Sequence, residues 1–214
     1  MAPRLSDRAY NAVRGMLSDG TLRAGQFVSQ RELCDLTDMP IAPTREAIQK
    51  LASEFLVTVI PQRGIRIAEA TPKAIRNAFG LRLMIESAAV RRFCETCTAD
   101  EAEALIARHQ AVRDSIGKTV TPAEVAEAHR IDQQMHVHIV QALANELIES
   151  IYTVNLDRIR LLRHDDGLMT PSALRQSFDE HITLLLACRD RDIDAAVEAI
   201  GFHIGATLRM ALGL

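Results

Sequence analysis

Hydrophobic side chains near the start of the chain follow a helical spacing. Apolar residues within positions 5–19 recur three and four apart, which predicts a helix, and Gly20 follows as a stop signal. Ser29 and Glu32 have the spacing of a capping box, in which each residue satisfies a backbone N–H of the other. They predict a second, short helix that ends near residue 36.

The next segment changes from a helical to a β-type pattern. A turn at residues 38–40 precedes a helix predicted over residues 42–53. Two runs rich in β-branched residues, 55–60 and 65–67, flank a loop that contains Gly64 and predict a hairpin. The order helix, helix-turn-helix, hairpin is that of a winged helix-turn-helix with a small β-hairpin wing.

Strand patterns are not found after residue 71, and helical signals replace them. Thr98 with Glu101, and Thr121 with Glu124, form two more capping boxes. Six or seven helices with short connections are expected in this part, which predicts an antiparallel all-α bundle. The fold class is therefore mainly α.

The change of pattern divides the chain into two predicted domains. Residues 1–70 form the winged helix and residues 71–214 form the helical bundle. Within the bundle, residues 117–121 and 164–170 are the predicted loops.

Composition and charge exclude several classes of protein. The chain has 214 residues of which 48% are hydrophobic, so a disordered chain is excluded. No apolar run approaches the roughly 20 residues that span a bilayer, and the first residues lack the apolar core of a signal peptide. We expect a cytoplasmic protein with no membrane partner.

Bulk charge neither favours nor opposes nucleic-acid binding. Residues 1–70 carry nine Lys and Arg against eight Asp and Glu, and residues 71–214 carry 16 against 20. Any DNA contact must depend on where single arginines lie. Aromatic residues make up 4%, which argues against stacking on single-stranded bases. Cys94 and Cys97 form one CxxC without a second ligand pair, and both are predicted to be plain helix residues.

One set of residues has the chemistry of a metal site. Asp132 and His136 stand four apart, so a helix places both on one face. His181 and His203 lie in the last two predicted helices, and an antiparallel pair can bring them to one depth. Three imidazoles and a carboxylate suit a divalent ion, with zinc preferred and nickel or another first-row metal as alternatives.

The other histidines leave an alternative open. A histidine on a helix can be a packed or a surface residue, and seven histidines can be scattered by chance. His129 shares the face of Asp132 and could replace a ligand or support one. His109 and His164 show no partner pattern and are predicted to lie on the surface.

A second set of residues fits duplex DNA. The helix over residues 42–53 is the one that enters the major groove in a winged helix. Ordinary solvated charges are the alternative explanation for these residues. The candidate DNA contacts are Arg31, Arg45, Gln49 and Lys50 in the two helices, and Arg63, Gly64 and Arg66 in the wing.

Several stretches resemble a known family. Residues 22–33 (LRAGQFVSQREL) and 43–51 (PTREAIQKL) resemble the DNA-binding half of GntR-type bacterial repressors, and residues 61–67 resemble their wing. The second half resembles the FCD ligand domain of the FadR-like subfamily. Its signatures are Arg82-x-x-x-Glu86, Asp132-x-x-x-His136 followed by Asn145, then Glu180-His181 and His203.

The resemblance implies a function for these residues. In that family an Asp and three His matching Asp132, His136, His181 and His203 hold a divalent metal in many members. A small carboxylate effector binds beside the metal, and Arg82 matches the arginine that approaches it. The family binds a palindromic double-stranded operator as a homodimer.

Two positions depart from the family. Pro40-Ile41 replaces the usual Ser-Arg before the recognition helix, so one DNA-contacting arginine is missing. Phe55 stands where a glycine is common, which can change the turn into the first wing strand.

The expected function is therefore a ligand-responsive transcriptional regulator, a repressor, and not an enzyme. A metal-dependent hydrolase is one alternative, but the sequence shows no HExxH helix and no extra pair of carboxylates near Asp132 or His181. A regulator whose metal is purely structural, or is itself the signal, is the other alternative.

Overall fold

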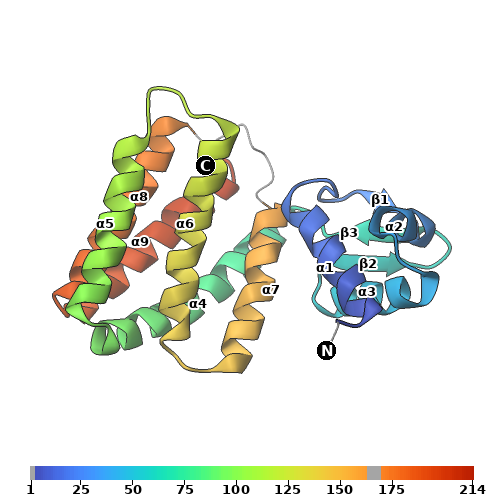
Figure 1. The fold of residues 1–214 in the computed structure, drawn as a ribbon, viewed down its shortest axis with the longest axis horizontal. Coiled ribbons are helices and arrows are strands. Elements are labelled where there is room, and N and C mark those ends of the chain that lie inside the picture. Colours follow the sequence, from blue (N-terminus) through green and yellow to red (C-terminus); the bar gives the residue numbers. More distant parts are fainter. Residues whose placement is uncertain (1–2, 163–169) are drawn as a thin grey trace. The chain divides into compact units, whose positions relative to one another are not determined.

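Residues 3–162 and 170–214 are described by a computed structural model, and they contain nine helices and one small sheet (Figure 1). The predicted mainly-α class, with a winged helix first and a helical bundle after it, is confirmed. The elements are α1 (Leu5–Ser18), β1 (Phe27–Val28), α2 (Gln30–Thr37), α3 (Ile41–Ser53), β2 (Val57–Ile60), β3 (Gly64–Ile67), α4 (Pro72–Thr96), α5 (Ala99–Ser115), α6 (Pro122–Gln141), α7 (Glu146–Leu162), α8 (Pro171–Arg189) and α9 (Ile193–Ala211).

The described residues divide into two compact units. One comprises the chain up to Ala78 together with α7 from Val154 onward, and the other comprises Phe79–Thr153 and the chain from 170. The proposed boundary at residues 70–71 falls between β3 and α4. Among the described residues, no helix combines the length and the hydrophobicity that a membrane span requires.

The first unit has the helix-turn-helix that the sequence predicts. The hydroxyl of Ser29 accepts a hydrogen bond from the backbone N–H of Glu32, and Glu32 accepts one from the N–H of Ser29, so the capping box starts α2. Asp38 ends α2 in the left-handed conformation, with φ of 52°, and the chain then turns into α3. Buried side chains from the three helices and the sheet share one core with Leu161 of α7.

The wing contains one strand more than the sequence predicts. The strands are antiparallel in the order β1-β3-β2, and β1 pairs Val28 with Ile65. Gly64 begins β3 with φ of 101°, and a Cβ there would lie 3.0 Å from the carbonyl oxygen of Val28. The close approach of β1 therefore explains why position 64 is a glycine.

The second unit is a helical bundle. α8 packs against α5 and α9, and α5 contacts α6. The capping boxes at Thr98 and Thr121 are both formed and start α5 and α6 where the sequence predicts. The chain between these helices forms the predicted loop at residues 117–121. The other predicted loop lies outside the described residues except for Thr170, which caps α8.

Candidate metal centre and DNA-binding surface

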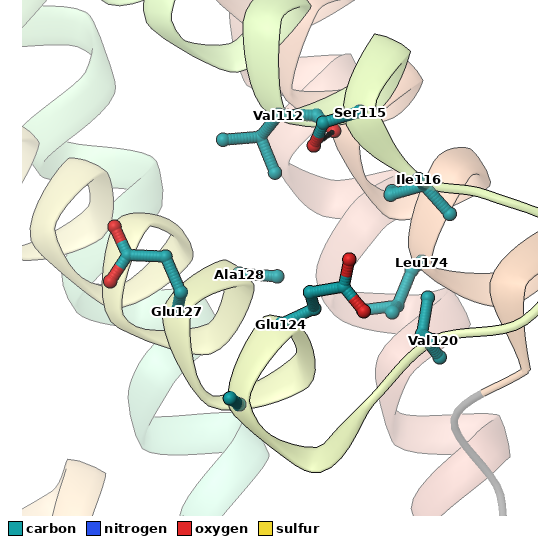
Figure 2. A pocket seen from close by; sticks show the side chains of 9 residues that line it. Val112, Ser115, Ile116, Val120, Glu124, Glu127, Ala128 and Leu174 are labelled. Carbon is teal, nitrogen blue, oxygen red and sulfur yellow. Dashed lines mark hydrogen bonds between the residues drawn. The ribbon is translucent and has the colours of Figure 1, made fainter.

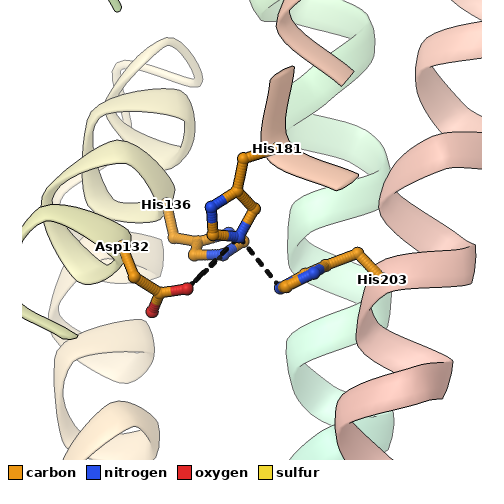
Figure 3. A group of neighbouring side chains, drawn as sticks. All are labelled: Asp132, His136, His181 and His203. Atoms are coloured by element: carbon orange, nitrogen blue, oxygen red, sulfur yellow. Dashed lines mark hydrogen bonds and ion pairs between the residues drawn. The ribbon is translucent and has the colours of Figure 1, made fainter. Parts of the chain in front are cut away.

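Three imidazoles and one carboxylate meet inside the bundle (Figure 3). Asp132 and His136 lie one turn apart on α6, while His181 comes from α8 and His203 from α9. One ligand atom from each residue lies within 4.8 Å of the others. Nε2 of His181 is 3.2 Å from Nε2 of His203 and 3.2 Å from Oδ1 of Asp132. The structure thus brings together all four residues that the spacing singles out.

Two of the rings are oriented by carboxylates on their outer side. The Nδ1–H of His136 donates to Oε2 of Glu86 at 2.6 Å, and the Nδ1–H of His203 donates to Oε2 of Glu180 at 2.9 Å. A proton held on Nδ1 leaves the lone pair on Nε2. The Nε2 atoms of these two rings lie on the side of Asp132 and His181, respectively.

The carboxylate of Glu86 binds three side chains. It accepts a hydrogen bond from Nε of Arg82 at 2.6 Å and another from the hydroxyl of Tyr152 at 2.6 Å, in addition to the one from His136. Burial would raise its pKa, but the charges of Arg82 and His136 lower the pKa of Glu86 to about 2. An ionised Glu86 therefore holds the His136 ring in place.

Burial and neighbouring charges set the protonation of the four ligands. Burial lowers the pKa of His181, and burial together with the charges of His181 and His136 lowers the pKa of His203 well below its usual range. Burial would lower the pKa of His136, but the Glu86 carboxylate raises it. Burial would raise the pKa of Asp132, but the neighbouring imidazoles of His136 and His181 lower it well below the usual value. Neutral rings at 181 and 203 and an ionised Asp132 are the metal-binding forms.

The cluster fits a divalent cation. Ligand atoms around a tetrahedral zinc ion lie about 3.3 Å apart, because each bond is about 2.0–2.1 Å long. Nε2 of His136 is buried and has no hydrogen-bond partner in the part of the chain that the structure describes. A buried polar atom without a partner costs about 1–3 kcal/mol, and a cation at this point would satisfy it. Three of the six distances between the ligand atoms are 3.2, 3.2 and 3.7 Å, near the zinc value, and all six lie within 4.8 Å.

The expectation that His109 lies on the surface is wrong. Its side chain is buried on α5, and its ring centroid is 5.4 Å from the centroids of both His181 and Phe178. The Nδ1–H donates to the carbonyl of Leu105 at 2.7 Å, whereas Nε2 finds no partner among the described residues. His109 therefore lies directly behind a metal-ligand candidate.

Two further histidines of the described part of the chain stay outside the cluster. His129 is exposed on α6 and is not among the grouped ligand atoms, so the idea that it replaces a ligand gains no support. His138 points to Glu101 of α5, 2.7 Å from its carboxylate. The prediction for His164 lies outside the described residues.

The CxxC residues lie at the end of α4. Cys94 is a buried helix residue as predicted, but Cys97 lies one residue beyond the end of α4 at Thr96, so the prediction for Cys97 is wrong. Sγ of Cys94 is 3.2 Å from Sγ of Cys188 on α8. Sequence spacing gives no sign of this contact, because 94 residues separate the two thiols.

The predicted recognition helix is α3, which begins at Ile41. Arg45 and Gln49 are both exposed and lie one turn apart on it. Lys50 is also exposed, with its ammonium 3.8 Å from the ring centroid of Tyr10 on α1. Arg31 is exposed in the first turn of α2. This arrangement can present polar side chains to base edges and phosphates.

The wing residues differ in how much of the side chain is available. Arg63 is exposed in the turn between β2 and β3. Arg66 is half-buried and forms an ion pair with Glu69. Gly64 has a structural role in the pairing of β1, which explains its conformation without DNA.

Comparison with known families identifies the combination of a winged helix with this helical bundle. Residues 5–67 match the family of bacterial regulatory proteins of the gntR family, and residues 77–206 match the FCD domain. The chain is a GntR-family transcriptional regulator with an FCD domain. The resemblance seen in the sequence is confirmed, as is the expectation of a regulator and not an enzyme.

Relatives of this GntR/FCD regulator support the same class. The HTH-type transcriptional repressor RspR of Escherichia coli is 25% identical over 204 residues, which cover 94% of this chain and 86% of that protein. The Nta operon transcriptional regulator of Aminobacter aminovorans is 29% identical over 181 residues, 81% of this chain and 80% of that protein. The solved structure of McbR/YncC from E. coli shares the fold, with a TM-score of 0.77 over 99% of both chains at 18% identity.

Proposed function

We propose that this regulator is a repressor whose operator binding is modulated by a small organic acid bound beside a divalent metal ion in the bundle. The observation that carries the proposal is the convergence of Asp132, His136, His181 and His203 from three helices. The carboxylates behind His136 and His203 support it, because such partners orient metal-binding imidazoles. When bound, the metal would offer open coordination positions to a carboxylate oxygen.

Arg82 supports an anionic effector. Its guanidinium is buried, and Nε donates to Glu86, which in turn contacts His136. Nη2 has no hydrogen-bond partner within the described ranges. A buried guanidinium N–H without a partner favours an acceptor such as a carboxylate. Arg82 is therefore our candidate for the effector contact.

The DNA-binding half of the proposal uses exposed side chains of the first unit. Arg45 and Gln49 of α3 would contact the major groove, with Lys50 and Arg31 beside them. Arg63, Gly64 and Arg66 of the wing would follow the adjacent backbone or minor groove. A homodimer would place two such units on a palindromic operator. We place the protein in the cytoplasm, where its DNA target lies.

The first experiment tests the metal. Purified protein is loaded with zinc and its metal content is measured for wild type, His203→Ala and the control His138→Ala. We expect one metal ion per chain in the wild type and the control, and none in His203→Ala, with circular dichroism confirming that all three are folded. Equal metal content in all three would refute the assigned ligands.

The second experiment tests the effector. A duplex is selected from a random pool with the wild-type protein, and its affinity is measured with and without a panel of small carboxylic acids. An acid that binds one dimer geometry better than the other by about 1–3 kcal/mol changes operator affinity roughly 5–150-fold. We expect this response to vanish in His203→Ala and in Arg82→Gln. A response to metal alone, with no acid active, would support the alternative in which the metal is structural or the signal.

A further inference from the structure

A cavity lies between α5, α6 and α8 (Figure 2), and none of the four metal-ligand candidates lines it. It has a volume of about 270 Å³, enough for roughly nine water molecules at about 30 Å³ each. Each carbon of an alkyl chain takes about as much space as one water. The cavity is thus large enough for a short organic molecule.

The wall of this cavity is apolar. Val112 and Ile116 come from α5 and the residue after it, Ala128 from α6 and Leu174 from α8, and all four point into the hollow in Figure 2. Ile116, Ala128 and Leu174 belong to a buried cluster that continues into the bundle. Hydrocarbon placed against this wall would be removed from water at a gain of about 25 cal/mol per Å².

The rim of the cavity is acidic. Among the described residues that line it, Glu124 and Glu127 are charged and none is basic. In Figure 2 the carboxylate of Glu124 points toward the hollow, whereas that of Glu127 points away. Both oxygens of Glu127 accept hydrogen bonds from the cationic Arg130, so its charge is already paired. Oε2 of Glu124 accepts only from neutral donors, the backbone N–H and the hydroxyl of Thr121, which leave its charge unpaired. A negative charge in the cavity would therefore be repelled, and a positive one attracted, mainly by Glu124.

Along α8, buried side chains separate the cavity from the metal centre, whereas on α6 the lining residue Ala128 lies one turn before Asp132. Leu174 and His181 are seven residues apart on α8, which corresponds to about 10 Å along a helix. Phe178 lies between them, and Ile131 occupies the same buried cluster on α6. The cavity is therefore distinct from the site that we assign to the organic acid.

The geometry points to a second ligand site in this cavity, specific for a short aliphatic molecule with an ammonium end. The alkyl chain lies against Val112, Ile116 and Leu174, and the ammonium lies beside Glu124. This site does not depend on the proposed metal and acid site, because the cavity shares none of its lining residues with it.

The test uses the full chain and isothermal titration with n-hexylammonium, 1-hexanol and hexanoate. We expect hexylammonium to bind most tightly, hexanol next, and hexanoate at least roughly tenfold more weakly than hexylammonium because of the like charge at the rim. Absence of binding by both hexylammonium and hexanol would overturn the site.

Two variants show where the probes bind. Ala128→Leu fills the cavity and should abolish binding of hexylammonium and hexanol, while unchanged binding in a folded variant would place the probes elsewhere. Glu124→Gln keeps the capping box, since glutamine serves at this helix position. The Glu124→Gln change should weaken the binding of hexylammonium about two- to fivefold, the range of an exposed ion pair, and leave the affinity for hexanol unchanged.

Glu127→Gln is the matched control, because it removes the same charge from a carboxylate that points away. We expect no change in either affinity. Equal effects of Glu124→Gln and Glu127→Gln would overturn the assignment of a cationic ligand. If hexanoate binds and loses its affinity in Ala128→Leu, the cavity accepts acids and the ligand class is wrong. Failure of these probes leaves the metal and operator experiments above unaffected.

Discussion

The Nδ1 atom of His136 lies 2.6 Å from Oε2 of Glu86, and both side chains are buried. Glu86 belongs to α4 and His136 to α6, so one hydrogen bond joins a metal-ligand candidate to a helix that supplies no ligand. The same carboxylate binds Arg82, the candidate effector contact. The buried Glu86 carboxylate would thus support both the metal ligand His136 and the effector contact Arg82.

Replacing Glu86 by glutamine tests this role. Loss of an orienting partner behind a metal-binding imidazole weakens metal affinity about 10–100-fold. The change also leaves Arg82 without its charged partner, which costs about 3–5 kcal/mol of stability for a buried pair. Zinc affinity from competition with a chelator and urea denaturation measure the two effects. Glu95→Gln, at an exposed ion pair on the same helix, is the control; an equal loss in both variants would contradict the assignment.

Acid should destabilise the metal-free bundle partly through His109. Burial and the neighbouring charge of His181 lower the pKa of His109 from 6.5 to about 4. His109 therefore binds a proton below pH 6.5 in the unfolded chain, but only below about pH 4 in the folded chain. The stability that His109 contributes is complete above pH 6.5 and is lost as the pH falls through this window, by about 3 kcal/mol at pH 4.

Chelator-treated wild type and His109→Leu should show the difference. The free energy of unfolding, measured in urea from pH 7 to 4.5, should fall more steeply in the wild type, by about 2–3 kcal/mol over this range. Parallel curves for the two proteins would show that His109 titrates as a solvated histidine.

Replacement by alanine should change the stability of the protein in opposite directions at two glycines. Gly64 has φ of 101° and a Cβ there would lie 3.0 Å from the carbonyl oxygen of Val28, so Gly64→Ala should cost about 1–3 kcal/mol. Gly80 lies inside α4 with nothing within 4 Å of a Cβ, so Gly80→Ala should add about 0.5–1 kcal/mol. Thermal melts of the two variants provide the test, and a neutral Gly64→Ala would mean that β1 does not pair closely with the wing.

The exposed Ile41 should influence which half-site is bound. It is the first residue of α3 and its side chain is 60% exposed, at the position where the family usually has arginine. An aliphatic side chain can contact the methyl group of thymine, whereas arginine prefers guanine. Ile41→Arg should therefore shift duplexes selected from a random pool toward guanine at one position per half-site, with a preference of about 1–3 kcal/mol. Leu36→Arg adds the same charge on α2 and should leave the selected sequence unchanged.

Local signals in the sequence predict much of this fold. The three capping boxes place the starts of α2, α5 and α6 within one residue, because each depends only on residues three positions apart. The spacing of Asp132 and His136 likewise fixes half of the metal cluster, since a helix puts both side chains on one face.

Contacts between distant segments could not be predicted in this way. β1 has two residues and is defined by its pairing with β3, about 40 positions later. The hydrogen bond from Tyr152 to Glu86 spans 66 residues. The burial of His109 did have a local signal, because Ala102 and Ile106 precede it on one helical face and are buried with it. The signal was missed because histidine is a polar residue, which the hydrophobic pattern does not count as buried.

Two residues of α7 belong to the winged-helix unit: Leu161 lies in its core, and Asp157 forms an ion pair with Arg14 of α1. Both lie about 90 residues after the wing in the sequence. The DNA-reading half is therefore not one continuous stretch of polypeptide. A fragment cut after residue 70 would expose apolar surface that Leu161 covers and leave Arg14 without its carboxylate. A chimera that joins this DNA-binding unit to another sensor domain would need both the N-terminal segment and the second half of α7.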